Sequence, residues 1–132
     1  MTDPFSAPQP RFLADRNLGR LTVQRLRDRG WDIIRLAEVF PDDAQDVPDQ
    51  DWLRYAGEHG LIGLTKDKRI RYQPSFRSAT TSVFALADGS LSIADMVDRF
   101  DAARERIWSQ ASTTQREFWM VYAKGRVARR AP

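Results

Sequence analysis

The chain of 132 residues contains no cysteine and a single histidine, His59. The absence of cysteine excludes disulfide bonds, zinc–thiolate sites and a thiol nucleophile, and it fits a reducing compartment. Without a second histidine, a metal site built from histidines is excluded as well. No apolar run approaches the ~20 residues that cross a membrane, and residues 1–12 lack the charged-then-apolar order of a secretion signal. We therefore expect a cytoplasmic protein with no membrane partner.

Length and proline content predict the domain organisation. A chain of this size suits one domain with one core, and 42% of its residues are hydrophobic. Three prolines, Pro4, Pro8 and Pro10, predict a flexible N-terminal arm over residues 1–10. No repeat or linker divides the remainder, so we expect residues 11–132 to form a single domain.

Charge is distributed unevenly along the chain, although the formal net charge is only +3. Residues 38–51 include acids but no lysine or arginine. Residues 66–77 hold one acid, Asp67, among five basic residues: Lys66, Lys68, Arg69, Arg71 and Arg77. An acidic pocket bordered by basic side chains is typical of a metal-dependent enzyme that acts on a polyanion.

The first half of the chain predicts a parallel sheet. Residues 11–15 form a short apolar strand, Asn17 is a candidate cap for the next helix, Gly30 ends that helix, and residues 31–36 form a second strand. A strand, a helix and a strand in this order indicate a right-handed βαβ unit.

The remaining elements continue this α/β pattern. A helix begins at Asp49 or Asp51 and ends near His59, and residues 61–64 form a third strand. We expect an irregular basic connection over residues 66–79, a fourth strand over residues 80–86, and a helix that Ser90 or Ser92 caps and that continues to about residue 107. Residues 118–121 are the last predicted strand.

Acidic residues follow two of the predicted strands. Asp15 follows the first strand and Asp67 the third. If these strands are parallel neighbours, the two acids emerge side by side, at the edge of the sheet where ligands bind. Carboxylates gathered there repel one another unless a cation neutralises them. A third acid, Asp49, is either a ligand or a helix cap, and the Thr65 hydroxyl is placed to hold one carboxylate in position.

The spacing of these residues resembles the signature of PIN-domain nucleases, the fold of VapC-type toxins. The match consists of Asp49, Ala56, the apolar residues 61–64, and Thr65 with Asp67; in the first strand it adds Asp15-Arg16-Asn17-Leu18. This resemblance implies a three-layer α/β/α domain with a mainly parallel central sheet. It also implies a ribonuclease centre with Mg²⁺ or Mn²⁺ held by Asp15, Asp49 and Asp67, in which Thr65 takes part.

By the same resemblance, the chain is the toxin half of a type II toxin–antitoxin pair, with RNA as substrate, a cognate antitoxin as partner, and a homodimeric state. Larger PIN domains carry an extra glutamate on a helix that is absent here. Glu38 is the best substitute, ahead of Asp42, Asp43 and Asp46, and Asp51 is the local rival of Asp49. The sequence after Asp67 also departs from the family, because Lys68-Arg69-Ile70 replaces the usual acid and phenylalanine.

The basic residues after the third strand are candidates for RNA phosphate binding: Lys66, Lys68, Arg69 and Arg71. On an extended chain, Arg69 and Arg71 share one face. Two alternative functions remain. A PIN-like module that binds RNA or protein without turnover fits the missing glutamate. A receiver-like phosphoacceptor domain also places acids at strand ends, but it requires adjacent acids after its first strand, where this chain has Asp15-Arg16.

Overall fold

The computed structural model describes residues 9–77, 81–112 and 116–130. Within them one six-stranded sheet has the order β2-β1-β3-β4-β5-β6, and only the β5–β6 pair is antiparallel. The strands are β1 (Arg11–Ala14), β2 (Asp32–Arg35), β3 (Ile62–Thr65), β4 (Val83–Leu86), β5 (Phe118–Val121) and β6 (Val127–Arg130). The mainly parallel sheet agrees with the prediction.

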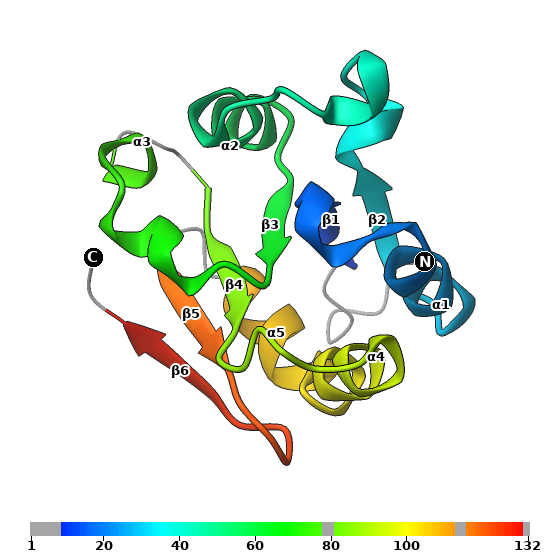
Figure 1. Cartoon of the computed structure of the whole chain (residues 1–132). Helices are drawn as coiled ribbons and strands as arrows, with labels where there is room; N and C mark the ends of the chain where they lie inside the picture. Colours follow the sequence, from blue (N-terminus) through cyan, green and yellow to red (C-terminus); the bar gives the residue numbers. More distant parts are fainter. Residues whose placement is uncertain (1–8, 78–80, 113–115, 131–132) are drawn as a thin grey trace, which may run out of the picture.

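Helices cover both faces of this sheet (Figure 1). One face carries α1 (Arg20–Asp28), α4 (Ile93–Ala102) and α5 (Arg104–Ala111); the other carries α2 (Asp49–Glu58) and α3 (Pro74–Arg77). Side chains alternate along each strand, so Phe12 packs with the α1 side and Leu13 with the α2 side. The two resulting cores confirm the three-layer α/β/α architecture.

The described parts of the connections contain four 3-10 helices: η1 (Arg16–Leu18), η2 (Leu36–Glu38), η3 (Asp42–Ala44) and η4 (Lys68–Tyr72). η2 follows β2 directly, Asp15 alone separates η1 from the end of β1, and η4 begins three residues after β3 ends. They therefore hold the backbone in fixed turns at the edge of the sheet where the candidate acids lie. No described helix is long and apolar enough to cross a membrane.

The predicted cap of the first helix was wrong. Asn17 lies in η1, and Gly19, with φ +81°, precedes α1 instead. This backbone conformation is costly for residues other than glycine. The side chain of Asn17 is directed to Thr65, with an Nδ2–Oγ1 distance of 3.1 Å.

Three further predictions need correction. The predicted connection over residues 66–79 contains η4 and α3 and is not irregular throughout. The predicted helix that reaches residue 107 is interrupted at Ala103; Ser92 caps its first half, α4, by accepting a hydrogen bond from the Asp95 N–H at 3.1 Å. β5 is not the last strand, because a turn with positive φ at Lys124 and Gly125 leads into β6.

Some predictions lie partly outside the described residues. The predicted arm is one of them, since only Gln9 and Pro10 of residues 1–10 are described. The start of the predicted fourth strand, at Thr80, lies outside them too.

Candidate active site

Asp15 and Thr65 lie at the point where the order of the strands changes direction. The chain leaves β1 for β2 on one side and later returns as β3 on the other. β1 and β3 are parallel neighbours, and the Asp15 N–H donates a hydrogen bond to the Leu64 carbonyl at 2.8 Å. In open α/β sheets this switch point, outside the carboxyl ends of the strands, is where ligands bind.

Thr65 connects the polar groups of this point. Its side chain is fully buried, and its hydroxyl donates a hydrogen bond to Asp15 Oδ2 at 2.8 Å. The same oxygen accepts hydrogen bonds from Asn17 Nδ2 at 3.1 Å and from the Asp67 N–H at 3.0 Å. The predicted hydrogen bond from Thr65 to a carboxylate is therefore confirmed, and it fixes Asp15 relative to the turn that contains Asp67.

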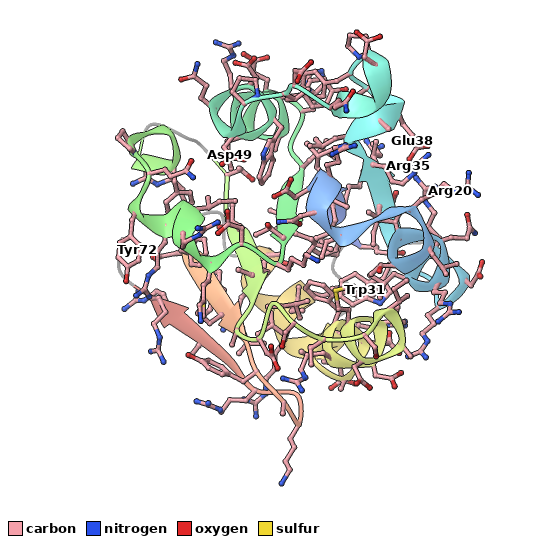
Figure 2. All side chains as sticks on the ribbon, viewed as in Figure 1. Arg20, Trp31, Arg35, Glu38, Asp49 and Tyr72 are labelled. Atoms are coloured by element: carbon pink, nitrogen blue, oxygen red, sulfur yellow. The ribbon has the colours of Figure 1, made fainter. Side chains whose placement is uncertain are left out.

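Asp49 is the first residue of α2 and does not cap it. Pro48 occupies the cap position, and the Asp49 carboxylate accepts a hydrogen bond from Trp52 Nε1 at 2.8 Å. Because Trp52 is completely buried, this bond anchors Asp49 on the side of α2 that faces the sheet (Figure 2). Its rival Asp51 lies 3.6 Å from Arg54 in an ion pair.

Asp15 has the most perturbed acidity of the described carboxyl groups. Burial and, to a smaller extent, the negative charge of Asp49 together raise its pKa from 3.8 to about 6, although the hydrogen bond from Thr65 acts in the opposite direction. Among the described residues, neither Asp15 nor Asp49 makes an ion pair with a lysine or arginine. Two mutually repelling carboxylates without a counter-charge are a favourable environment for a cation.

Asp67 is differently placed. Its Oδ1 accepts hydrogen bonds from the Arg69 N–H at 3.0 Å and from Arg69 Nε at 3.1 Å. Across the described part of the chain, no three histidine, aspartate or glutamate side chains form a cluster that could hold a metal ion. The structure thus brings Asp15 and Asp49 into electrostatic contact, whereas the carboxylate of Asp67 is occupied by Arg69.

The side-chain atoms available near Asp15 are of the type that hard cations bind. The carboxylates of Asp15 and Asp49 and the amide of Asn17 offer oxygen, which Mg²⁺ and Mn²⁺ prefer. Asp67 lies two residues after Thr65 in the turn, and its carboxylate would need to exchange Arg69 for a metal ion to join the other ligands. Its role as a ligand stays a prediction.

Glu38, the suggested substitute for the missing glutamate, has its charge matched by arginines. Although partial burial acts in the opposite direction, the Arg35 N–H and the Arg27 guanidinium hold the pKa of Glu38 below its usual range. Arg27 also donates to the Ile33 carbonyl at 2.7 and 2.9 Å. These contacts tie α1 to β2, so we assign Glu38 a structural role and leave its metal-binding role untested.

A cleft of about 460 Å³ beside Asp15 was not predicted. Three arginines line it: Arg16 after β1, Arg20 at the start of α1 and Arg35 at the end of β2. Figure 2 shows Arg20 and Arg35 at this end of the sheet. The spacing of Arg16 and Arg20 next to Asp15 was a weak sequence signal, but only the fold brings in Arg35. The positive charge of this cleft suits a phosphate.

The predicted RNA-binding residues after β3 do not form one face. Residues 68–72 form η4, in which residues two apart point about 240° around the axis, so the expectation that Arg69 and Arg71 share a face was wrong. Arg69 is paired with Asp67, and the Arg71 guanidinium lies 4.4 Å from the centre of the Tyr72 ring. Lys66 is partly buried and Lys68 is exposed. Their binding of RNA stays a prediction.

Comparison with known proteins identifies the family. Residues 10–87, more than half of the chain, match the family model described as PIN like domain. A curated Mycobacterium tuberculosis protein, "Putative ribonuclease VapC45", is 39% identical over 62 residues, which cover 46% of this chain and 45% of that protein. This chain therefore matches slightly less than half of the length of that relative. No solved structure matches. The matched family region includes Asp15, Asp49, Thr65 and Asp67, and the chain belongs to the PIN-like domain family.

Proposed function

We propose that the protein is a metal-dependent endoribonuclease whose centre lies at the carboxyl ends of β1 and β3. The observation that carries this proposal is the hydrogen bond from the buried Thr65 to Asp15 at the switch point of a PIN-like sheet. The ribonuclease named among the relatives supports the choice of reaction and of RNA as substrate.

Asp15 and Asp49 are the proposed metal-holding residues, and Asp67 is a third once it is released from Arg69. The ion would be Mg²⁺ or Mn²⁺, which, when bound, supplies an activated water and offsets the negative charge that develops on the phosphate. Thr65 is a positioning residue, because its single hydroxyl holds Asp15 and the Asp67 backbone together.

The basic groups around the acids would bind the RNA backbone. Arg16, Arg20 and Arg35 line the cleft beside Asp15, and Lys66, Lys68, Arg69 and Arg71 follow β3. Such groups orient a phosphodiester without reading its sequence. A single strand or loop suits this arrangement better than a stiff duplex.

The partners follow from the likeness to VapC-type toxins. We infer that the chain is the toxin of a type II toxin–antitoxin pair, that a small cognate antitoxin inhibits it, that it dimerises, and that it acts in the cytoplasm. The direct check is co-expression: the wild-type chain should arrest growth when it is expressed alone, and a small protein encoded beside it should restore growth.

The nuclease proposal is tested by incubating purified protein with single-stranded RNA in Mn²⁺, in Mg²⁺ and in EDTA. Slow cleavage is expected, faster with Mn²⁺, whose coordination is more tolerant of an incomplete set of ligands, and absent in EDTA. An Asp15→Asn variant prepared in parallel controls for contaminating nucleases. If wild type and variant cleave equally in every metal, a non-catalytic PIN-like binding module replaces the nuclease; the present contacts of Asp67 and Glu38 favour that second candidate.

A further inference from the structure

Two arginines converge on one tyrosine at the β5–β6 hairpin. The Arg126 guanidinium lies 3.9 Å from the centre of the Tyr122 ring. The Arg130 guanidinium donates a hydrogen bond from Nη2 to Tyr122 Oη at 2.8 Å and lies 5.8 Å from the same ring. The backbone supports the arrangement, because the Tyr122 N–H donates to the Arg126 carbonyl at 2.8 Å.

Several arginines of the described residues are paired with an acid, and these two are not. Arg104, for example, pairs with Asp101 at 2.6 Å, and Arg129 pairs with Glu117 at 3.5 Å. Within the described residues, neither Arg126 nor Arg130 makes an ion pair, and both are exposed. Two like charges held against one ring repel each other, so the arrangement favours an anion that lies between them or bridges them.

The turn of the hairpin lies at the same edge of the sheet as the acids, whereas Arg130 lies opposite Phe118, at the far end of β6, and reaches Tyr122 through its side chain. Val121 ends β5 beside Leu86, the last residue of β4, and Tyr122 therefore follows at the carboxyl ends of the parallel strands. Tyr122 packs against the core on the α2 side, as Ala87 does. This is also the side on which α2 presents Asp49.

Hydrogen bonds connect the hairpin to the turn that contains Asp67. Lys68 Nζ donates to the Ala87 carbonyl at 3.4 Å, and the Ala87 N–H donates to the Val121 carbonyl at 3.0 Å. Ala87 therefore lies between Lys68 and Tyr122. β3 and β6 are three strand spacings apart, about 14 Å, which is roughly the length of four stacked nucleotides.

We propose that Arg126 and Arg130, positioned by Tyr122, form a phosphate-binding subsite for single-stranded RNA that extends the substrate track from the acids across Lys68 to the β5–β6 hairpin. This inference rests on the proposed ribonuclease function for the direction of the track. The subsite lies outside residues 10–87, the part of the chain that matches the PIN-like family. It binds a phosphate several nucleotides away from the scissile bond and takes no part in the chemistry.

The test measures binding of a 20-nucleotide single-stranded oligo(U) in EDTA, where metal-dependent cleavage is absent. Each lost phosphate contact should lower the slope of log K against log salt by about 0.7 and weaken binding on the order of 5-fold at 0.1 M salt. The double variant Arg126→Gln with Arg130→Gln should therefore lose about 1.4 in slope and on the order of 25-fold in affinity. Tyr122→Phe keeps the ring and removes the hydrogen bond to Arg130, so we expect a smaller loss of affinity and slope than in the double variant.

Arg25→Gln is the matched control. Arg25 is an exposed arginine of α1, on the opposite face of the sheet, and it makes no ion pair within the described residues. Its substitution removes one positive charge, as each single hairpin substitution does, and should leave the slope unchanged. A hairpin double variant whose affinity and slope equal those of wild type overturns the inference, as does a loss in Arg25→Gln half as large as that of the double variant, which would indicate net charge alone.

Two further measurements, binding of poly-glutamate and cleavage of RNA, distinguish a failure of the subsite from a failure of the proposed nuclease function. If the hairpin variants lose affinity for poly-glutamate but keep their affinity for oligo(U), the surface binds an acidic protein and the RNA subsite is wrong. Cleavage that depends on Asp15 while the hairpin variants bind RNA normally refutes the subsite and leaves the nuclease intact. RNA binding that depends on Arg126 and Arg130 in a protein that cleaves nothing supports the subsite and refutes the nuclease.

Discussion

Replacing Asp15 with asparagine should stabilise the metal-free protein. Burial raises the pKa of Asp15 from 3.8 to about 6, so the folded state binds this proton more tightly than the unfolded state. The stability from the bound proton is fully present below pH ~3.8 and is lost as the pH rises through 6. The difference between the pKa values of Asp15 in the unfolded and folded states amounts to about 3 kcal/mol of lost stability at pH 7.5.

An asparagine side chain at this position cannot ionise, but it keeps an oxygen that can accept the hydrogen bond from Thr65. Asp15→Asn should therefore raise the free energy of unfolding by up to about 3 kcal/mol at pH 7.5, and by only about 1 kcal/mol at pH 4.5, where the wild-type carboxyl is still mostly protonated in the folded state. Mn²⁺ should stabilise wild type by mass action and leave the variant unchanged.

The assay is urea unfolding in EDTA at both pH values, with free energies compared at a common m-value. Asp51→Asn is the matched control, because Asp51 is an acid of the α2 start that pairs with Arg54 at 3.6 Å; its effect should stay within about 0.5 kcal/mol. A variant at position 15 that is less stable than wild type at pH 7.5, or a gain that does not depend on pH, would refute this account of the buried carboxylate.

Three further experiments with substituted proteins test the remaining parts of the site. Asp49→Ala should lower RNA cleavage on the order of 100-fold, while Asp51→Ala leaves it nearly unchanged; the reverse order in a cleavage assay would show that the wrong acid was chosen. Thr65→Val leaves the partly buried Asp67 N–H and the Asn17 amide without their acceptor and should lower the free energy of unfolding in urea by about 1–3 kcal/mol; an unchanged free energy would contradict the positioning role of Thr65. Neutralising Arg69 and Arg71 together should weaken RNA binding and lower its salt slope by up to about 1.4, and equal slopes in variant and wild type would remove these residues from the RNA contact.

Much of the fold follows from local sequence patterns. β1, β2, β3 and β5 contain apolar runs that end at glycine or polar residues, and the helix period is clear in α2 and α4. β6 was missed because an edge strand exposes its side chains, and Val127-Ala128-Arg129-Arg130 has little of the apolar pattern that identifies a strand. The helix break at Ala103 was missed because no glycine or proline lies there to indicate it.

The sequence predicted those parts of the site that depend only on where a residue lies in its own strand or helix. Asp15 and Asp67 could be placed at strand ends because strand ends are local features, and the Thr65 hydrogen bond follows from β1 and β3 being neighbours. Gly19, and not Asn17, precedes α1, because the Asn17 side chain hydrogen-bonds to Thr65. This tertiary contact cannot be predicted from the helix preferences of single residues. The same holds for the Arg27–Glu38 ion pair and for the arginines that line the cleft.

Binding of Mn²⁺, measured by calorimetric titration, tests the central claim most directly. Wild type and Asp51→Asn should bind the ion, because Asp15 and Asp49 keep their uncompensated charges. Asp15→Asn should abolish binding while the fold, checked by circular dichroism, is retained, and Asp67→Asn should do the same if Asp67 leaves Arg69 to join the site. Undiminished binding in Asp15→Asn would contradict a metal centre at the end of β1 and, with it, the proposed nuclease.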